Sequence, residues 1–303
     1  LTGLCTIGSV LDSGTLIALL FALSAAVLFG LNPHIQNRAL DDTDPLTGAL
    51  YSVTATAGMF WLFSPFFIDW AWFGTRTALI FAAVGLIFPA FGQRLQIASI
   101  VIVGPAITAA CGSFTPLFAI LPAVVFLGES FGLQASFGLM LLTSGLVFAA
   151  LGRGKIKRNW PLWALLLPLA ASFVRGLAQP ITKFGFAEIP SPYFATMLMA
   201  TVSVGTLLVI RTLSTPRQKA SSGLSKSGKQ RFLFSGIING FGILSVNMAL
   251  SFGDVSVVAP FLATSPLFTL ALGAWVFRRE VLGWHHLAIV AVAIAGAVLV
   301  ITR

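Results

Sequence analysis

The hydrophobic positions of this chain form long apolar runs, separated by short stretches that carry charged residues, glycine, proline or tryptophan. A helix needs about 20 mostly apolar residues to cross the hydrocarbon core of a bilayer. By this criterion the runs predict ten membrane-spanning helices, at 14–37, 47–68, 77–97, 100–127, 132–151, 161–183, 193–212, 232–252, 256–277 and 283–302. Only a short stretch around Ser99 separates the third from the fourth. The predicted fold class is an all-α polytopic membrane protein.

The composition excludes a water-soluble globular protein. Hydrophobic residues make up 57% of the 303 positions and charged residues only 9%, whereas soluble domains carry roughly 25% charged residues. The lipid bilayer is therefore the expected surroundings of the chain, and its short loops leave no room for a sizeable soluble domain. The net charge of +9 could suggest nucleic-acid binding, but the basic residues are spread over loops between apolar runs rather than gathered on one solvated face. No nucleic-acid partner is expected.

Loops on alternate sides of the predicted bundle differ strongly in positive charge. Fourteen of the 18 Lys and Arg residues fall on one side, three fall on the other, and Arg175 lies within a span. Cytoplasmic loops retain Lys and Arg, so we expect a multi-pass protein of the bacterial inner membrane with both termini on the non-cytoplasmic side. No basic stretch precedes the first apolar run, so this run, after a tail at 1–13, is predicted to be a retained span.

The chain contains an internal duplication. Residues 114–119 (FTPLFA) resemble residues 264–269 (TSPLFT), and residues 125–129 (VFLGE) resemble residues 276–280 (VFRRE). Further equivalent pairs are Pro33 with Pro180 and Pro45 with Pro192. We therefore predict a five-helix repeat at 14–151, a basic linker at 152–160 and a second five-helix repeat at 161–303. Because five is odd, the second repeat enters the membrane in the opposite orientation, and inverted repeats of this kind are typical of transporters.

These features resemble the EamA branch of the drug/metabolite transporter superfamily. The matching segments run from Thr115-Pro116 through Gly128-Glu129 to Gly145, and from Ser265-Pro266 through Glu280 to Gly296. The resemblance implies export or exchange of amino acids and related metabolites, and in length and layout the chain is similar to bacterial aromatic amino-acid exporters. The turn Arg278-Arg279-Glu280, where Gly-Glu is usual, and the acidic loop that begins at Asp41 depart from the family pattern. These departures bear on the substrate.

Arg175 is the strongest candidate for a substrate contact. An arginine in the centre of a span costs about 2.5–3.5 kcal/mol on insertion scales, so it should face a partner or a water-filled cavity. Its guanidinium can bind a carboxylate through two parallel hydrogen bonds. Gln179 lies one turn further along the same helix face. The alternative is a structural contact between Arg175 and the carbonyl groups of a helix end.

Further polar side chains in the spans complete the predicted substrate site. They are Asn32, His34, Gln93, Thr115, Trp163, Asn239, Asn247 and Ser265. Amides offer donors and acceptors to a zwitterion, but they can equally hold helices together. His34 and Trp163 have interfacial positions as their alternative. Four prolines are predicted hinges, since proline inside a helix frees a carbonyl one turn back and kinks the helix; they are Pro33, Pro116, Pro180 and Pro266.

The positions of the acidic residues bear on whether transport is coupled to protons. All nine fall in tails, loops or span ends, so we expect a uniporter or exchanger rather than a proton-coupled carrier. The predicted function is secondary transport of amino acids or related small metabolites out of the cell by alternating access. We expect a functional monomer, with no catalytic residues, no metal and no cofactor. Alternatives are a membrane-embedded enzyme that acts on lipids or isoprenoids, a proton-coupled drug efflux carrier, and an ion channel or scaffold.

Overall fold

The protein is a bundle of helices whose computed structural model describes residues 13–37, 45–151, 160–213 and 226–275, with positions 292, 295, 296, 299 and 300. In chain order the helices are α2 (Ser13–Asn37), α3 (Pro45–Phe67), η2 (Trp70–Gly74), α4 (Arg76–Ile87), α5 (Ala90–Ile102), α6 (Pro105–Gly112), α7 (Thr115–Leu127), α8 (Leu133–Leu151), η3 (Leu162–Leu165), α9 (Leu166–Phe186), α10 (Pro192–Leu213), α12 (Lys226–Phe252), α13 (Val255–Leu262) and α14 (Ser265–Trp275). Helices satisfy their backbone hydrogen bonds internally, as a bilayer requires.

The described helices account for most of the predicted spans. Eight helical segments are long and apolar enough to cross a membrane, and a shorter apolar helix runs over Leu133–Phe148 within α8. The tenth predicted span, at 283–302, lies outside the described residues except for the five single positions. One of these, Gly296, packs against α8, where a Cβ added at Gly138 would lie 2.7 Å from the carbonyl oxygen of Gly296. The prediction of a helical multi-pass membrane protein is confirmed.

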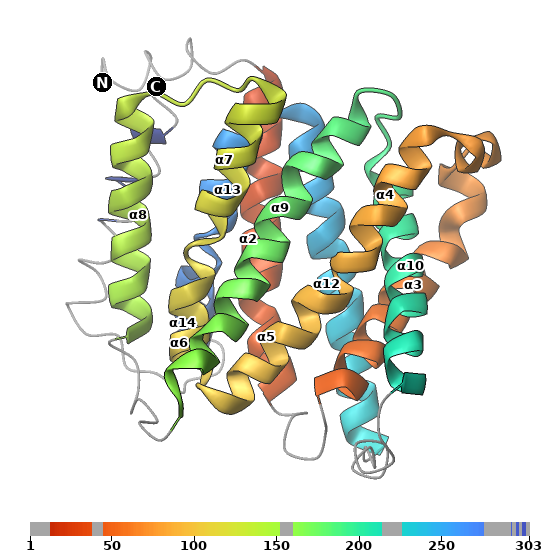
Figure 1. Ribbon diagram of the computed structural model, residues 1–303, viewed down its shortest axis with the longest axis horizontal. Helices are drawn as coiled ribbons and strands as arrows, with labels where there is room; N and C mark the ends of the chain where they lie inside the picture. The colour runs from red at the N-terminus through yellow and green to blue at the C-terminus, as the bar shows by residue number, and fades with distance from the viewer. Residues whose placement is uncertain are drawn as a thin grey trace.

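The connections define two ends of the bundle (Figure 1). The upper end in this view carries the connections at 68–75, 128–132, 187–191 and 253–254. At the lower end lie the turn between α5 and α6, the last residues of α2, α8 and α10, and the first residues of α3, η3 and α12. Helix α2 therefore runs from the upper to the lower end, and α9 runs from the lower to the upper end.

The predicted boundary between the third and fourth spans is wrong. Ser99, taken as the separator, lies inside α5, where its hydroxyl forms a buried hydrogen bond with the hydroxyl of Thr108 at 2.6 Å. The chain turns later, at Gly104, whose φ of 91° is a conformation that favours glycine. Pro105 then begins α6, at a position where a helix does not need the N–H that proline lacks. The boundary was set by the Gly-Pro pair and not by the polar serine.

Two predicted spans are each interrupted at equivalent points, 150 positions apart. The break between α6 and α7 is bridged by the Phe114 N–H, which donates to the Cys111 carbonyl at 3.1 Å. The break between α13 and α14 is bridged by the Thr264 N–H, which donates to the Phe261 carbonyl at 3.1 Å. The structure thus places a discontinuity just before Pro116 and its equivalent proline, rather than a kink within a continuous helix.

Close contacts between the repeats occur in equivalent pairs. Helix α2 packs against α14, and a Cβ added at Gly30 would lie 2.9 Å from the carbonyl oxygen of Ser265. Helix α9 packs against α7 in the same way, and a Cβ added at Gly176 would lie 2.7 Å from the carbonyl oxygen of Thr115. Glycine is required at both points because the facing atoms are backbone atoms and the Cβ of a phenylalanine, none of which can move away independently of the helix. The first helix of each repeat thus packs on the fourth helix of the other repeat.

A second equivalent pair joins the second and third helices. The Thr56 hydroxyl on α3 donates to the Gly236 carbonyl on α12 at 2.7 Å. The Ser203 hydroxyl on α10 donates to the Gly85 carbonyl on α4 at 2.5 Å. Both glycines lie against backbone of the facing helix. Because the same contacts occur twice between helices of opposite direction, the bundle has an approximate two-fold axis perpendicular to its helices.

We expect Gly236→Ala to lower the unfolding free energy by about 1–3 kcal/mol, the usual cost of overpacking, because the new Cβ would overlap the carbonyl oxygen of Ser52. Gly58→Ala is the matched control, since Gly58 on α3 has no atom within 4 Å of an added Cβ. This control should be neutral or stabilising by up to about 1 kcal/mol through helix propensity. Thermal unfolding of the purified protein in detergent measures both. Equal melting temperatures for the two variants would contradict the proposed close packing.

Candidate functional site

Arg175 lies half-buried in the middle of the bundle, on α9. Its guanidinium donates a short hydrogen bond to the amide oxygen of Gln96 on α5. The guanidinium carbon lies 6.0 Å from the ring centroid of Phe29 on α2, within cation–π range. In the described part of the chain no carboxylate forms an ion pair with Arg175. The positive charge therefore lies against a neutral amide and an aromatic ring.

Phe29 and Arg175 occupy equivalent positions in the two repeats. Each residue directly precedes the glycine that packs against the fourth helix of the other repeat, Gly30 on α2 and Gly176 on α9. Their side chains meet between the first helices of the two repeats. The contact therefore lies close to the approximate two-fold axis, where a bound solute would be equally distant from both ends.

Gln179 lies one turn beyond Arg175 and has an unsatisfied amide oxygen. The residue is 5% exposed, and its Oε1 is buried without a hydrogen-bond partner among the described residues. A buried acceptor left unpaired costs about 1–3 kcal/mol. Such a group is expected where a ligand completes the hydrogen bonding. Gln179 is therefore the second candidate contact, on the same helix face as Arg175.

The reason for the missing partner is a difference between the repeats. Asn32 is the equivalent of Gln179, and its amide oxygen accepts from the Ser235 hydroxyl on α12 at 2.6 Å. The position on α4 equivalent to Ser235 is Val84, which has no polar side-chain atom. The first repeat therefore supplies no partner for Gln179 where the second repeat supplies one for Asn32.

The predicted residues Asn32 and Asn239 belong to a satisfied polar cluster. The Asn32 amide nitrogen lies 3.5 Å from the amide oxygen of Asn239, and the Gln36 amide donates to the Ser235 hydroxyl at 3.0 Å. Together with the bond from Ser235 to Asn32, these contacts join α2 to α12. Since every member has a partner within the cluster, its geometry favours the holding of helices over substrate binding.

Three other predicted residues have partners away from Arg175. The Gln93 amide lies 3.5 Å from the Ser52 hydroxyl on α3. The Asn247 amide donates to the Thr196 hydroxyl on α10 at 2.8 Å. His34 Nε2 lies 2.9 Å from the Thr269 carbonyl oxygen on α14. These contacts again join helices, and the structure does not bring the three residues together with Arg175.

Thr115, Ser265 and Trp163 complete the predicted set. Thr115 and Ser265 begin α7 and α14, and their carbonyl oxygens face the glycines of α9 and α2, so both act in helix packing. Trp163 lies in η3 and is 60% exposed. This exposure at the lower end favours the alternative prediction for Trp163, an interfacial position, over a substrate contact.

The four predicted hinge prolines fall into two kinds. Pro33 and Pro180 lie inside α2 and α9, whose helices continue past them. Pro116 and Pro266 each occupy the second position of α7 and α14, directly after a break. A proline there costs no hydrogen bond, because the first helical N–H groups have no partner within the helix. Whether any of the four acts as a hinge stays a prediction.

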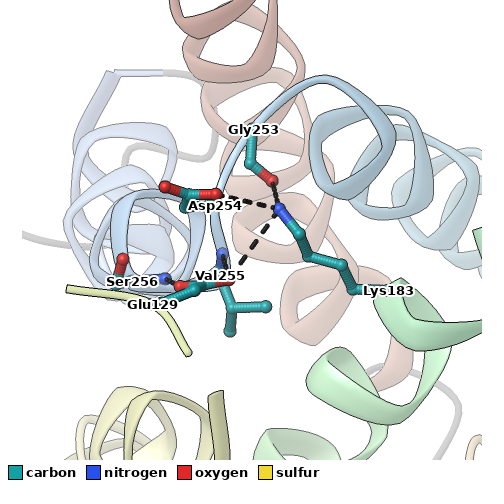
Figure 2. Close-up of polar contacts among 6 residues, drawn as sticks. All are labelled: Glu129, Lys183, Gly253, Asp254, Val255 and Ser256. Atoms are coloured by element: carbon teal, nitrogen blue, oxygen red, sulfur yellow. Dashed lines mark hydrogen bonds and ion pairs between the residues drawn. The ribbon is translucent and has the colours of Figure 1, made fainter. Parts of the chain in front are cut away.

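The upper end holds a charged group that the sequence did not reveal (Figure 2). Lys183 on α9 donates to the Gly253 carbonyl at 2.6 Å and to Asp254 Oδ1 at 3.1 Å, and its Nζ lies 3.8 Å from Glu129 Oε1. Glu129 follows α7, at a span end as expected, but its side chain is only 5% exposed. A buried carboxylate is therefore present, at the upper end rather than beside Arg175.

Comparison with known proteins identifies the family. A profile described as the EamA-like transporter family matches residues 16–151 and matches again over residues 162–302. The chain belongs to the EamA-like transporter family. One solved crystal structure is similar to it with a TM-score of 0.75, covering 93% of this chain and 95% of its own at 14% sequence identity, which supports the fold alone. A search of curated proteins found no match.

In this EamA-like transporter two polar contacts could not be predicted from the sequence. The sequence predicted Gln93 as a substrate contact, whereas the partner of Arg175 in the structure is Gln96 on the same helix. Glu129 was expected only as part of the Gly128-Glu129 motif and at a span end, because nothing in a single sequence pairs it with Lys183 of the other repeat. The signal that could have found Glu129 was its place in the Gly-Glu turn of the repeat. Among the described residues no group of three or more His, Cys, Asp or Glu could hold a metal ion.

We expect Asn32→Ala to destabilise the EamA-like bundle more than Asn239→Ala does. Asn32 accepts the short bond from Ser235, whereas its contact with Asn239 is long at 3.5 Å. Interhelical hydrogen bonds in membranes contribute about 0.6 kcal/mol on average and up to roughly 1.7 kcal/mol, so Asn32→Ala should lie near the upper value. Ser24→Ala, on the same helix but bonded only to the Leu20 carbonyl, is the control. Thermal unfolding in detergent gives the order, and the reverse order would contradict a structural role for Asn32.

Proposed function

We propose that this protein is a secondary transporter that exports amino acids or related small metabolites, with Arg175 as the contact for the substrate carboxylate. The observation that carries the proposal is the guanidinium of Arg175 in mid-bundle, which pairs with the Gln96 amide and the Phe29 ring and with no carboxylate of the described chain. A substrate carboxylate would supply the missing negative charge. A bidentate pair of this kind is among the strongest polar contacts in proteins.

The surroundings of Arg175 favour a substrate with a second polar group. Gln179 Oε1 is a buried acceptor without a partner in the described residues, one turn from Arg175. An ammonium group next to a carboxylate would donate to it, which matches the zwitterion of an amino acid. Phe29 offers an aromatic face for the apolar part of the solute. These three groups come from α2 and α9, the first helices of the two repeats.

The inverted repeats support transport by alternating access. Two equivalent sets of contacts allow two nearly equal packings of the bundle, and a site near the approximate axis could face either end in turn. The carboxylates of Glu129 and Asp254, which contact Lys183, lie at the upper end and not beside Arg175. We therefore propose that a monomer transports the substrate by uniport or exchange, without a proton-binding carboxylate next to the substrate.

The orientation in the membrane follows from the basic residues. Of the 18 Lys and Arg residues in the sequence, six lie between α8 and η3 or between α10 and α12, and four more lie in the adjoining ends of α10 and α12 (Arg211, Lys226, Lys229 and Arg231). Positively charged loops remain in the cytoplasm. We infer that the lower end faces the cytoplasm of a bacterial cell, that the upper end faces outward and that the protein lies in the inner membrane.

The test of substrate binding is solute counterflow in liposomes, with purified protein and a panel of labelled amino acids. Wild type should show saturable exchange of at least one of them. Arg175→Ala should weaken binding at least about tenfold, since a hydrogen bond to a charged group contributes about 1.5–3 kcal/mol. Arg175→Lys should retain part of the binding, because lysine keeps the charge but not the two-pronged geometry.

Arg76→Ala is the matched control for these variants, because Arg76 begins α4 at the upper end and is exposed. Its exchange should equal that of wild type. Unchanged affinity in Arg175→Ala would show that Arg175 does not bind the substrate. An ohmic current through the liposome membrane would show that the protein is a channel and not a carrier. If transport stopped when a pH gradient was removed, the protein would be a proton-coupled carrier and not a uniporter or exchanger. Gel filtration and melting curves show whether each variant is folded.

The proposed orientation is tested with reporters fused to the C-terminus. A reporter that is active only outside the cytoplasm should be active in bacterial cells, because ten spans with a cytoplasmic lower end place the C-terminus outside. A reporter active only in the cytoplasm should be silent. The opposite pattern would mean an odd number of spans or an inverted orientation.

A further inference from the structure

Glu129 caps a helix of the other repeat. It follows α7 in the first repeat, and its two carboxylate oxygens accept from the N–H groups of Val255 at 2.9 Å and Ser256 at 2.8 Å, the first two residues of α13 (Figure 2). The first N–H groups of a helix have no partner inside the helix and carry partial positive charge. The carboxylate therefore satisfies α13 from outside its own repeat, and it joins the two repeats at the upper end.

The residue that could cap α13 locally is engaged elsewhere. Asp254 occupies the N-cap position with the extended backbone typical of a cap, φ −72° and ψ 146°, but its side chain makes no cap hydrogen bond. Its Oδ1 accepts from Lys183 at 3.1 Å instead. The helix thus has two possible caps of the same chemistry, one local and one from the other repeat, and the structure uses the second.

The contact between the repeats is one-sided. Helix α7 packs against α13 at the upper end, where Glu129 lies. The equivalent pair at the lower end would be α14 and α6, which show no comparable packing within the described segments. The structure is therefore held together between the fourth helices of the two repeats at its upper end.

We propose that Glu129 is a latch that closes the upper end, and that the latch opens when Asp254 replaces Glu129 as the cap of α13. In the closed state Glu129 caps α13 and Asp254 pairs with Lys183. In the open state Asp254 turns to the N–H groups of its own helix, Lys183 keeps the Gly253 carbonyl, and the end of α7 separates from α13. The proposal rests on the proposed transport function only in making this opening a step of the transport cycle.

The exchange of caps explains how two repeats joined by a buried carboxylate can separate. Breaking a buried charge contact is costly when it leaves donors unpaired. Here the N-cap residue Asp254 can accept from the N–H of Ser256, so of the two N–H groups that Glu129 satisfies only that of Val255 loses its side-chain acceptor in the open state. A bistable element of this kind requires that the two arrangements differ little in free energy.

The test measures access to a buried cysteine behind the latch. Ala123 is fully buried on α7, about one and a half turns before Glu129. The reporter protein carries Ala123→Cys with the native cysteines replaced (Cys5→Ser and Cys111→Ala), in lipid nanodiscs, and the rate of labelling by a hydrophilic maleimide is recorded. Nanodiscs expose both ends, so the result does not depend on the orientation in the membrane.

The two acidic residues should have opposite effects. Glu129→Ala should raise the labelling rate roughly tenfold, because both contacts to α13 are lost, and Glu129→Gln, which keeps one carbonyl acceptor, should raise it less. Asp254→Ala should lower the rate at least about threefold, because it removes the competing cap. The control is Asp69→Ala, a carboxylate at the same end that caps only η2, through the Ala71 N–H; its rate should equal that of the parent.

The opposite signs separate a latch from a merely structural contact. If both acidic variants raised the rate, Glu129 and Asp254 would only stabilise the upper end, and the latch would be refuted. It would equally be refuted if Glu129→Ala and Glu129→Gln left the rate unchanged. If the Glu129 and Asp254 variants shifted the labelling rate in opposite directions but the protein showed no counterflow, the latch would be upheld and the transport proposal overturned. If the protein showed counterflow but neither variant changed the labelling rate, the transport proposal would be upheld and the latch overturned.

Discussion

Close approach of backbones is the constraint on which this bundle depends. Helices in lipid gain little from burying apolar side chains against one another, so association relies on packing and hydrogen bonds between them. Here glycines admit the facing backbone at Gly30 and Gly176, and again at Gly85 and Gly236. All four contacts join one repeat to the other. The repeats are therefore interleaved rather than placed side by side, and a movement of one helix pair changes contacts in both halves.

The polar groups show where the two repeats have diverged. The amide oxygen of Asn32 is already occupied, because it accepts a hydrogen bond from Ser235 on α12. Gln179 occupies the equivalent place on α9, where its amide oxygen is unpaired within the described chain, and valine stands at the α4 position equivalent to Ser235. In one repeat this polar stripe is therefore a contact between helices. In the other it holds an arginine paired with a neutral amide and an amide oxygen without a partner in the described residues.

Much of the fold was predictable because apolar length and repeated motifs are local signals. Eight apolar helices long enough to cross a membrane and an interruption of regular helix near Pro116 and Pro266 could be anticipated from the sequence, although kinks were expected where the structure has breaks between helices. The partners of Arg175 could not, since Gln96 and Phe29 lie on helices far apart in the chain and many amides compete for one guanidinium. The Ser99 boundary failed because a hydroxyl inside a span looks like a loop residue until its partner, Thr108, is known. Glu129 was placed correctly but its burial depends on α13, which no local pattern links to it.

The meeting of Phe29 with Arg175 has a consequence for the origin of the fold. Two separate copies of one five-helix chain, related by an exact two-fold axis, would bring identical residues together at this point. Two arginines would repel each other in a medium of low dielectric constant, and two phenylalanines would leave the axis without charge. Two different sequences are needed to place one cation against one aromatic ring at this point, and the two diverged repeats of this chain provide them. Divergence between the repeats is thus a condition for this pairing.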